Sequence, residues 1–436
     1  MMLSRLSRAG LSSGGLLNRA NSKFNMALSS NFDYIIIGAG IIGLTVAYEL
    51  INRFPDLKIL IVEKEADVAQ HASGRNSGVL HAGFYYTADS LKARFTVEGN
   101  RRMKAFCRAN GVKVNETRKV VVAANGDELE MLHELKRRGD RNGVTLKLID
   151  EKQLAAIDPN INTCRQALYS PNTASVDPRQ VCQKLKSLLK DRVAFRFNTQ
   201  VRQIRENVVS AGNFSADFRY LINCAGLYAD KIAQQMGVGK EFTMLPFKGL
   251  YLKYAGDQNI VKTNVYPVPN LNNPFLGVHF TKTVNDEVKI GPTAIPAFWR
   301  EHYRGFSRFS LSEFAEVLFW EAKLFLQNRF NFRRLALSEM KKYLPHVLIN
   351  EAKHMVRRIG DSFKPMPPGI RAQLLNKKTG ELVMDFVVEH GKRSTHVLNA
   401  VSPAFTCAFS FAEYVVDEAL KSGAPDKSIA EVLNPS

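Results

Sequence analysis

Cysteine and long apolar runs are both scarce in this sequence. Its five cysteines lie far apart and form neither a C-x-x-C motif nor a Cys/His cluster with metal-ligand spacing, so we expect reduced thiols and no metal site. The longest runs without Asp, Glu, Lys or Arg, residues 263–281 and 394–412, have 19 residues each, and proline and asparagine interrupt both. Because a membrane-spanning helix needs about 20 predominantly apolar residues, we predict no transmembrane helix.

Acidic residues are absent from the beginning of the chain, where the first one is Asp33. The first 30 residues hold seven serines and four cations, which are Arg5, Arg8, Arg19 and Lys23. A basic, serine-rich and acid-poor segment is typical of a mitochondrial presequence, with a disordered basic tail as the alternative. We therefore predict that residues 1–30 are a mitochondrial transit peptide.

The whole chain carries a net charge of +19. Such an excess suits nucleic acid, an anionic membrane or an anionic small substrate. No recognisable RNA- or DNA-binding module accompanies it, so we expect no nucleic-acid partner. A basic nucleic-acid-binding or assembly protein stays as a distant alternative.

A βαβ unit is predicted at the start of the folded region. Residues 33–37 are typical of a buried parallel strand, residues 41–52 of a helix, and residues 58–63 of a second strand. The motif Gly38-Ala-Gly40-Ile-Ile-Gly43 lies between the first strand and the helix, and Glu63 follows it by 20 residues. In this pattern Gly38 permits the tight turn, Gly40 lets a diphosphate approach the backbone, Gly43 allows close helix packing and Glu63 holds a ribose hydroxyl.

Two later segments are predicted to return to the same sheet. Residues 218–226 form a strand that ends in a small-residue turn at Gly226, and residues 395–400 form another strand. Ser402 is expected to cap the next helix, with Pro403 at its first position and the helix continuing from about Ala404.

The fold class that follows is α/β, with a doubly wound, Rossmann-like dinucleotide domain. We assign residues 32–115, 171–245 and 354–430 to this domain. Residues 116–170 and 246–353 contain alternating patterns such as 248–253 and 275–280, and we interpret them as one inserted antiparallel-sheet substrate domain of the α+β type.

The segment Ser73-Gly-Arg-Asn-Ser-Gly-Val-Leu-His81-Ala-Gly83, together with the returns to the sheet, resembles the D-amino-acid-oxidase-like superfamily of flavoproteins. The resemblance implies FAD as the cofactor and hydride transfer to its N5 atom. Further motifs narrow this resemblance to one family within the superfamily. They are Val176-Asp-Pro178, Phe247-Lys-Gly249, Tyr266-Pro-Val-Pro269, Gly277-Val-His-Phe280, Gly291-Pro-Thr293, Gly369-Ile-Arg-Ala372 and Asn399-Ala-Val-Ser-Pro403. These motifs resemble the family of L-2-hydroxyglutarate dehydrogenases and related oxidases, over about residues 32–425.

The resemblance implies a site for FAD and for a small dicarboxylic hydroxy acid. A histidine near neutral pKa suits removal of the hydroxyl proton, and His81 is the first candidate, with His279 as the alternative. In some amine-oxidising relatives a histidine placed like His81 is instead a covalent flavin attachment point. The substrate carboxylates need cations or donors, for which the candidates are Lys248, Arg371, Lys92 and Tyr266, and Lys248 is also a candidate catalytic residue. The expected cofactor-binding residues are Gly38, Gly40, Gly43, Glu63, Ser73, Arg75, Asn76, Ser77, Gly226, Arg371, Ser402 and Pro403.

Residues 298–335 combine aromatic residues at helical spacing with six arginines. One interpretation is a pair of interfacial helices that contact anionic lipid and bring the flavin near a quinone. The alternative is a core or subunit-contact helix with solvated charges. By resemblance, the protein is expected in the mitochondrial matrix or at the inner membrane.

The favoured activity is oxidation of L-2-hydroxyglutarate to 2-oxoglutarate. A close alternative is oxidation of an amino acid or secondary amine on the same fold, because both reactions deliver hydride to the flavin and need a carboxylate clamp. The electron acceptor, a quinone or an electron-transfer flavoprotein, stays open.

Overall fold

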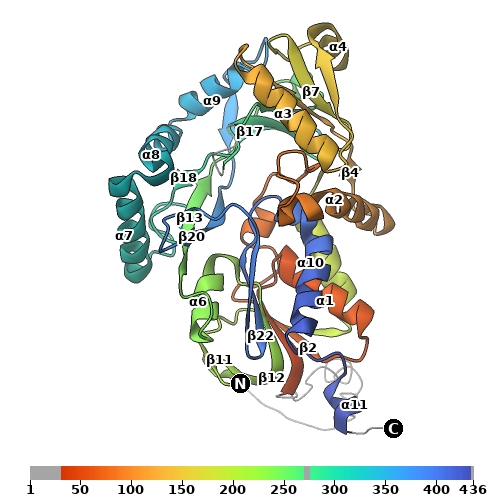
Figure 1. The fold of residues 1–436 in the computed structure, drawn as a ribbon, viewed down its shortest axis with the longest axis vertical. Helices are drawn as coiled ribbons and strands as arrows, with labels where there is room; N and C mark the ends of the chain where they lie inside the picture. The colour runs from red at the N-terminus through yellow and green to blue at the C-terminus, as the bar shows by residue number, and fades with distance from the viewer. Residues whose placement is uncertain (1–30, 270–274, 434–436) are drawn as a thin grey trace, which may run out of the picture.

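The computed structural model describes residues 31–269 and 275–433 (Figure 1). The predicted presequence lies outside these residues. Within them, no helix combines the length and the apolar composition that crossing a bilayer requires.

A parallel βαβ unit opens the fold, as predicted. Strands β1 (Asn31–Ile37) and β2 (Ile59–Val62) pair in parallel, with α1 (Ile41–Arg53) between them in sequence. Tyr34 and Ile36 pack on the face that carries α1, whereas Ile35 and Ile37 pack on the opposite face. Both faces of the strand are therefore buried, which explains its continuous apolar run.

Six more strands complete this first sheet, which lies in the lower half of Figure 1. They are β9 (Val193–Arg196), β10 (Gln203–Arg205), β11 (Val208–Ala211), β12 (Phe214–Asn223), β21 (Val387–Gly391) and β22 (Ser394–Asn399). Strand β12 runs parallel to β1, and β22 runs parallel to β12. Both predicted returns to the sheet are confirmed.

Helices cover the α1 face of the first sheet. Helix α10 (Ala404–Lys421) packs against α1 and α2 (Leu91–Ala109), and α5 (Pro178–Leu189) packs beside α1. The predicted cap of α10 is wrong, because Pro403 itself occupies the N-cap position and no side chain caps the helix. The opposite face is covered by α6 (Ala229–Gln235), and side chains of β10 and β11 extend the apolar core on that face.

A second eight-stranded sheet lies above the first in Figure 1. Its strands are β5 (Lys119–Val122), β6 (Lys147–Asp150), β7 (Gln166–Ser170), β14 (Leu252–Tyr254), β15 (Asn264–Pro267), β16 (His279–Lys282), β17 (Val288–Gly291) and β19 (Phe363–Pro365). Strands from the two predicted insertions meet where β5 pairs with β15. That pair is parallel, so the sheet is mixed rather than purely antiparallel. The domain boundaries themselves stay a prediction.

Helices also cover the second sheet. The covering helices are α3 (Glu128–Arg141), α4 (Glu151–Ile157) and α9 (Pro345–Lys353). Leu132 and Leu135 of α3 pack on the face that also carries Tyr266, and Leu348 of α9 packs on the other face. Each face of this sheet therefore has its own apolar core.

A smaller sheet joins the two large ones. It contains β13 (Phe242–Gly249), β18 (Ile295–Pro296) and β20 (Gly369–Asn376), and it packs against α7 (Leu311–Gln327) and α8 (Phe332–Lys341). The single strand predicted over residues 248–253 is wrong, because β13 ends at Gly249 and β14 starts at Leu252. The helical segment predicted near residues 311–335 is also interrupted, since Asn328 and Asn331 are left-handed.

Three short strands form the last sheet, which includes part of the Ser73–Gly83 segment that resembles flavoproteins. They are β3 (Val79–Leu80), β4 (Val114–Asn115) and β8 (Ala174–Val176). Because β3 ends one residue before His81, pairing of β3 with β8 fixes the position of that histidine.

Candidate active site

A long cavity of about 600 Å³ runs between the two large sheets. Its lining begins with Glu63 and the α1 turn in the first sheet and reaches Tyr266 and His279 in the second. The volume falls within the roughly 300–1,000 Å³ typical of ligand and cofactor pockets. An extended ligand in this cavity would therefore touch both halves of the molecule.

The glycine turn at one end of the cavity leaves no room for side chains. Gly38 has φ +104°, and a Cβ on it would lie 2.5 Å from the carbonyl oxygen of Cys224. A Cβ on Gly43 would lie 2.0 Å from the carbonyl oxygen of Gly38. Gly43 accordingly packs the helix against the turn, as predicted, and does not itself line the cavity. The first turn of α1 can thus face the cavity with its backbone N–H groups.

Glu63 is held in place at the same end. One carboxylate oxygen accepts the Ala39 N–H at 2.8 Å, and the other accepts the Glu65 N–H at 2.9 Å. The residue lines the cavity, as the motif predicts for a group that binds a ribose. Its acidic side chain beside the turn would repel a 2′-phosphate.

The segment 72–77 forms one wall of the cavity. Ser73 accepts the Ile41 N–H at 2.9 Å and so ties this segment to α1. Arg75 donates to the carbonyl of Gln70 and lies 4.4 Å from the centroid of the Tyr303 ring. The remaining predicted cofactor residues that line the cavity are Gly40, Asn76, Ser77, Gly226, Ser402 and Pro403.

Two histidines and a tyrosine meet at the far end. His81, His279 and Tyr266 all line the cavity, and the His279 imidazole stacks on the Tyr266 ring at 3.7 Å between centroids. Burial and, to a smaller extent, positive neighbours including Lys119 lower the pKa of His279 to about 3, although the hydrogen bond to Gly277 opposes them. Burial, then Lys119 and His279, also hold the pKa of His81 well below its usual value. Both imidazoles are therefore neutral at physiological pH.

The tautomer of His279 follows from its neighbour. Its Nδ1 lies 2.8 Å from the carbonyl oxygen of Gly277, which can only accept, so Nδ1 carries the proton. The Nε2 atom then carries a lone pair, and no described residue donates a hydrogen bond to it. The first turn of α10 opens beside His81, whose backbone N–H donates to the Thr406 hydroxyl at 3.1 Å.

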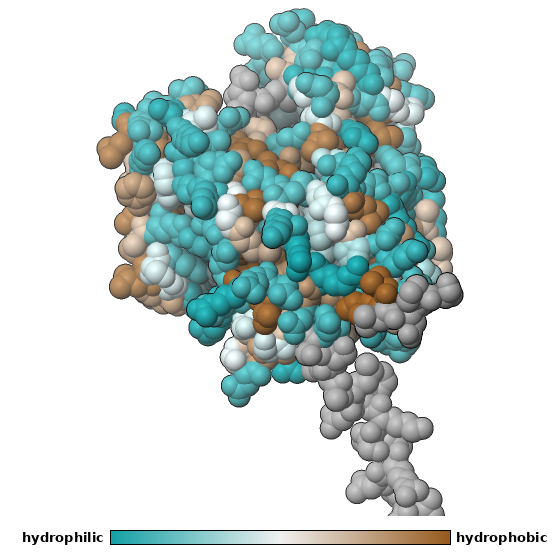
Figure 2. Space-filling view, turned by 60° about the horizontal axis from the view of Figure 1, so that its bottom comes forward, coloured by the Kyte–Doolittle hydropathy of each residue, from teal (hydrophilic) through white to brown (hydrophobic). Residues whose placement is uncertain are grey.

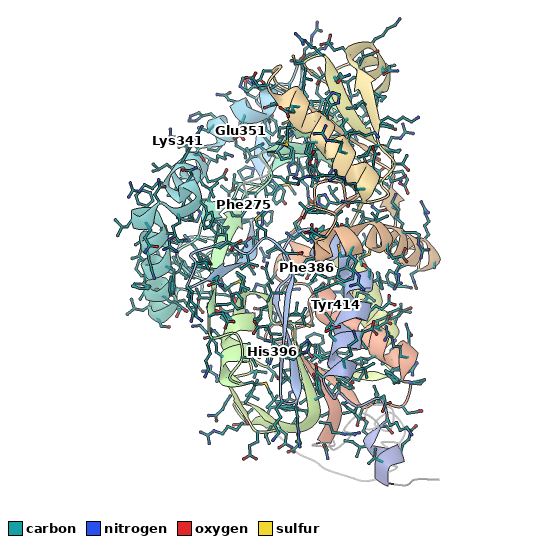
Figure 3. The ribbon with its side chains drawn as sticks, in the orientation of Figure 1. Phe275, Lys341, Glu351, Phe386, His396 and Tyr414 are labelled. Carbon is teal, nitrogen blue, oxygen red and sulfur yellow. The ribbon has the colours of Figure 1, made fainter. Side chains whose placement is uncertain are left out.

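Arg371 is the cation at this end of the cavity. Its guanidinium lies 4.7 Å from the centroid of the Phe275 ring, a residue near the middle of the molecule in Figure 3. Burial lowers the pKa of Arg371, and no carboxylate among the described residues forms an ion pair with it. Its donors are therefore available to an anion in the cavity.

Comparison with known proteins decides the family. The family model described as FAD dependent oxidoreductase matches residues 33–418, which is nearly the whole described chain. The chain belongs to this FAD-dependent oxidoreductase family. FAD is accordingly its cofactor, and the α/β fold class predicted from the sequence is confirmed.

Curated relatives of this oxidoreductase share about a third of its residues. It is 36% identical to the L-2-hydroxyglutarate dehydrogenase of Escherichia coli K12, covering 89% of this chain and 93% of that one. It is 34% identical to the mitochondrial L-2-hydroxyglutarate dehydrogenase of Nematostella vectensis, covering 93% and 94%. The human mitochondrial enzyme of the same name is 33% identical, covering 90% and 89%.

Solved structures share the fold of this flavoprotein at lower identity. The L-α-glycerophosphate oxidase of Mycoplasma pneumoniae with FAD bound has a TM-score of 0.70 and 21% identity, covering 92% of this chain and 99% of that one. Glycine oxidase from Geobacillus kaustophilus has a TM-score of 0.65 and 16% identity, covering 90% and 95%.

The residues present fit FAD. The turn at Gly38 and Gly40 exposes backbone and no side chain, Glu63 stands where a ribose hydroxyl needs an acceptor, and the α10 first turn opens at the other end. Gly226, at φ +54°, has no atom within 4 Å of a Cβ position, which leaves open space along the middle of the cavity. These features suit an extended dinucleotide between the two sheets of the flavoprotein.

Two lysines predicted at the substrate do not line the cavity of the flavoprotein. Side chains alternate along β13, so Phe247 and Gly249 face the cavity while Lys248 turns away, toward the Tyr343 ring. The Lys92 ammonium lies over the Tyr86 ring, and the Lys92 backbone N–H, in the first turn of α2, donates to the Asp385 carboxylate. This corrects the placement of both residues.

Lys119 is a residue that the motifs did not indicate. It begins β5, and its side chain is fully buried. Its Nζ lies 3.4 Å from Nδ1 of His81 and 3.8 Å from the centroid of the Tyr266 ring. In sequence it is only a charged residue before three valines, so nothing local predicts that it reaches the flavoprotein's histidines.

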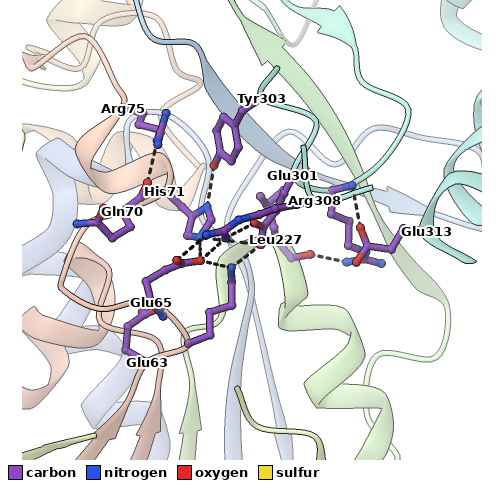
Figure 4. A network of polar contacts seen from close by, with 12 residues as sticks. Glu63, Glu65, Gln70, His71, Arg75, Leu227, Glu301, Tyr303, Arg308 and Glu313 are labelled. Atoms are coloured by element: carbon purple, nitrogen blue, oxygen red, sulfur yellow. Dashed lines mark hydrogen bonds and ion pairs between the residues drawn. The ribbon is translucent and has the colours of Figure 1, made fainter. Parts of the chain in front are cut away.

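A network of charges closes one side of the cavity (Figure 4). Glu65 pairs with Lys64, His71 and Arg308, and Glu301 pairs with Lys64 and Arg308. Hydrogen bonds from Arg308, Lys64 and His71 lower the pKa of Glu65, although burial opposes them. Glu65, His71 and Glu301 have the spacing of metal ligands, but two cations already neutralise the carboxylates. The network therefore ties the flavoprotein's 63–71 loop to its 300–308 segment.

Proposed function

We propose that this protein oxidises L-2-hydroxyglutarate to 2-oxoglutarate, with FAD as the oxidant. The observation that carries the proposal is Arg371, which lines the cavity with His81 and His279 and forms no ion pair with a described residue. A carboxylate clamp beside neutral bases is what oxidation of a 2-hydroxy acid needs. The names of the E. coli, Nematostella and human relatives support the same substrate.

The chain would hold FAD along the whole cavity. Glu63 would bind the ribose, and the backbone at Gly40 would bind the diphosphate, with Ser73 and Arg75 alongside. The first turn of α10 would place its positive end where the ring gains negative charge. When bound, FAD supplies the acceptor for the hydride that leaves C2 of the substrate.

Proton removal falls to the histidines. Both imidazoles are neutral, so each can accept a proton, and His81 is the proposed base because it lies in the flavin motif and beside the first turn of α10. His279 is proposed to accept a hydrogen bond at its free Nε2 and so orient the substrate. Arg371 would bind a substrate carboxylate through its planar guanidinium.

A substrate panel tests the proposed reaction against amine oxidation. We expect anaerobic L-2-hydroxyglutarate to bleach the flavin absorbance, and D-2-hydroxyglutarate, sarcosine, proline and glycine to leave it unchanged. The measurement is the visible spectrum of the purified holoprotein before and after each addition. Bleaching by an amine alone would replace the proposal with its amine-oxidising alternative.

Substitution of Arg371 tests the carboxylate clamp. Arg371→Met removes a charge-assisted contact worth about 2–3 kcal/mol, so we expect kcat/KM to fall roughly 30- to 150-fold. Arg371→Lys keeps the charge and loses the planar fork, so its loss should be intermediate. Steady-state kinetics with an artificial dye measure both. An unchanged kcat/KM in Arg371→Met would show that the carboxylate binds elsewhere.

We also propose a mitochondrial location with peripheral contact at the inner membrane. The eukaryotic relatives are named as mitochondrial proteins, and the first 30 residues have the composition of a presequence. Helices α7 and α8 and the turn between them present large apolar side chains outward. These are Leu311, Leu318, Phe319 and Leu326 on α7, Phe330 in the turn, and Leu337 and Met340 on α8. In Figure 2, hydrophobic colour gathers along the left edge, the side on which Figure 1 places these helices.

Part of the predicted membrane segment faces inward instead. Trp299 is buried, and the fully buried Arg300 forms an ion pair with Asp230 at 2.6 Å. The outward face therefore consists of α7, α8 and the exposed Phe306 in the preceding loop, and Arg333 and Arg334 are exposed in the first turn of α8. Apolar residues beside cations suit the interface of an anionic bilayer, and a quinone dissolved there would be the electron acceptor.

Vesicle binding tests this contact. Sedimentation with cardiolipin-containing phosphatidylcholine vesicles should retain the mature chain, and Phe319→Ser with Leu326→Ser should weaken binding at least roughly tenfold, because less apolar surface is buried. The matched control is Leu188→Ser with Met384→Ser, two other exposed apolar side chains, and it should bind normally. Equal binding by both double variants would contradict the proposed surface.

A further inference from the structure

Lys119 occupies an environment that is unusual for a lysine. Phe84, Tyr85 and Tyr266 surround its ammonium, whose distances to the three ring centroids are 5.7, 5.1 and 3.8 Å. No acidic residue among the described ones pairs with it, and its polar neighbour is Nδ1 of His81 at 3.4 Å. A buried lysine without a counter-ion is costly to keep charged.

The groups that face Lys119 are few. They are His81 in the loop after β3, Tyr85 in the same loop, Tyr266 on β15 and His279 on β16. Lys289 and Arg371 add positive charge around His279. The titratable groups around Lys119 are thus neutral rings or cations, and none is an acid. Burial lowers the pKa of Lys119 from 10.5 to about 7.

We propose that Lys119 is the proton acceptor behind His81, so that the two side chains act as a relay in the oxidation step. This rests on the proposed hydroxy-acid oxidation. In its neutral form the Lys119 amine accepts a hydrogen bond from Nδ1–H of His81, which leaves Nε2 of His81 as the base facing the cavity. In its charged form Lys119 donates to Nδ1, which places the proton on Nε2 and blocks the base.

Each turnover moves two protons along the relay and one hydride to the cofactor. The substrate O–H bond breaks and its proton goes to Nε2 of His81, while the proton on Nδ1 moves to the Lys119 amine. The electron pair of the C2–H bond leaves as hydride to FAD, so C2 is oxidised to the ketone as the cofactor is reduced. The ammonium of Lys119 returns its proton to solvent through His81 once the product leaves. Lys119 touches no substrate, so it is a positioning residue that acts through His81.

Two variants separate a relay from a role in charge or packing. Lys119→Met keeps the length and loses the amine, whereas Lys119→Arg keeps a charge that cannot be neutralised. In the wild-type protein the anaerobic bleaching rate should rise with pH through an apparent pKa near 7, because Lys119 must lose its proton. Both variants should lose this rise and bleach about 100-fold more slowly.

Folding of the variants is checked independently. The unfolded chain binds the Lys119 proton more tightly than the folded one, so this lysine opposes folding below the ordinary pKa of 10.5. Lys119→Met should therefore melt at a higher temperature than the wild type at pH 7. The control Lys282→Met removes another buried lysine, which donates to the Gln258 carbonyl, and should keep the pH profile.

A spectroscopic readout does not depend on turnover. In [¹⁵N]histidine-labelled protein, the His81 imidazole, assigned with His81→Gln, should change tautomer near pH 7 and stop doing so in Lys119→Met. A bleaching rate within about threefold of wild type in either variant, or an unchanged His81 titration, would overturn the relay. A wild-type protein that L-2-hydroxyglutarate never bleaches would refute the proposed function instead, and the imidazole titration would then decide the coupling alone.

Discussion

The cavity depends on close backbone packing at the turn between β1 and α1, where Gly38 lies against the Cys224 carbonyl and Gly43 against the Gly38 carbonyl. A Cβ at Gly38 or Gly43 would collide with backbone oxygen atoms, so only glycine lets the turn close and α1 point its first turn at the cavity. Ser73 then bonds to that turn, and Glu63 to the Ala39 N–H. The cofactor wall is thereby fixed by main-chain geometry, and side-chain chemistry is left to the opposite end.

That opposite end is organised by charges that lack partners. The half-buried Arg371 and the fully buried Lys119 form no ion pair with any described residue, and His81 and His279 are held neutral beside them. Two other buried cations do have acidic partners, since Arg300 pairs with Asp230 and Lys342 with Glu339. A buried cation without such a partner lowers stability, which is the cost of the binding and proton transfer proposed for Arg371 and Lys119.

Local patterns were enough to predict the elements of the first sheet and its glycine motif. The apolar run of β1, the helix after Gly40 and the returns at β12 and β22 each carry their signal within about ten residues. The predictions of a cap at Ser402 and of a single strand over residues 248–253 were wrong, because tertiary contacts decide where an element begins and ends. The placement of Lys248 at the substrate was wrong for a related reason. Alternation along a strand shows that its two faces differ, but it does not show which face lines the cavity.

The contacts between residues far apart in the chain could not be predicted from the sequence. Lys119 meets His81 across 38 positions, and Glu65 meets Arg308 across 243, so no spacing rule joins them. Helical spacing over residues 311–335 was recognised, but the interfacial interpretation covered the whole segment 298–335, of which Trp299 and Arg300 are buried. Only the packed fold separates residues that share a segment into those facing a core and those facing out.

FAD uptake by the protein stripped of flavin is the most direct test of the central claim that an extended dinucleotide spans both sheets. Titration followed by flavin fluorescence should saturate at one FAD per chain and restore a yellow protein, and Gly40→Val should abolish uptake while the chain stays folded by circular dichroism. A folded wild-type protein that stays colourless and takes up no FAD would contradict the account.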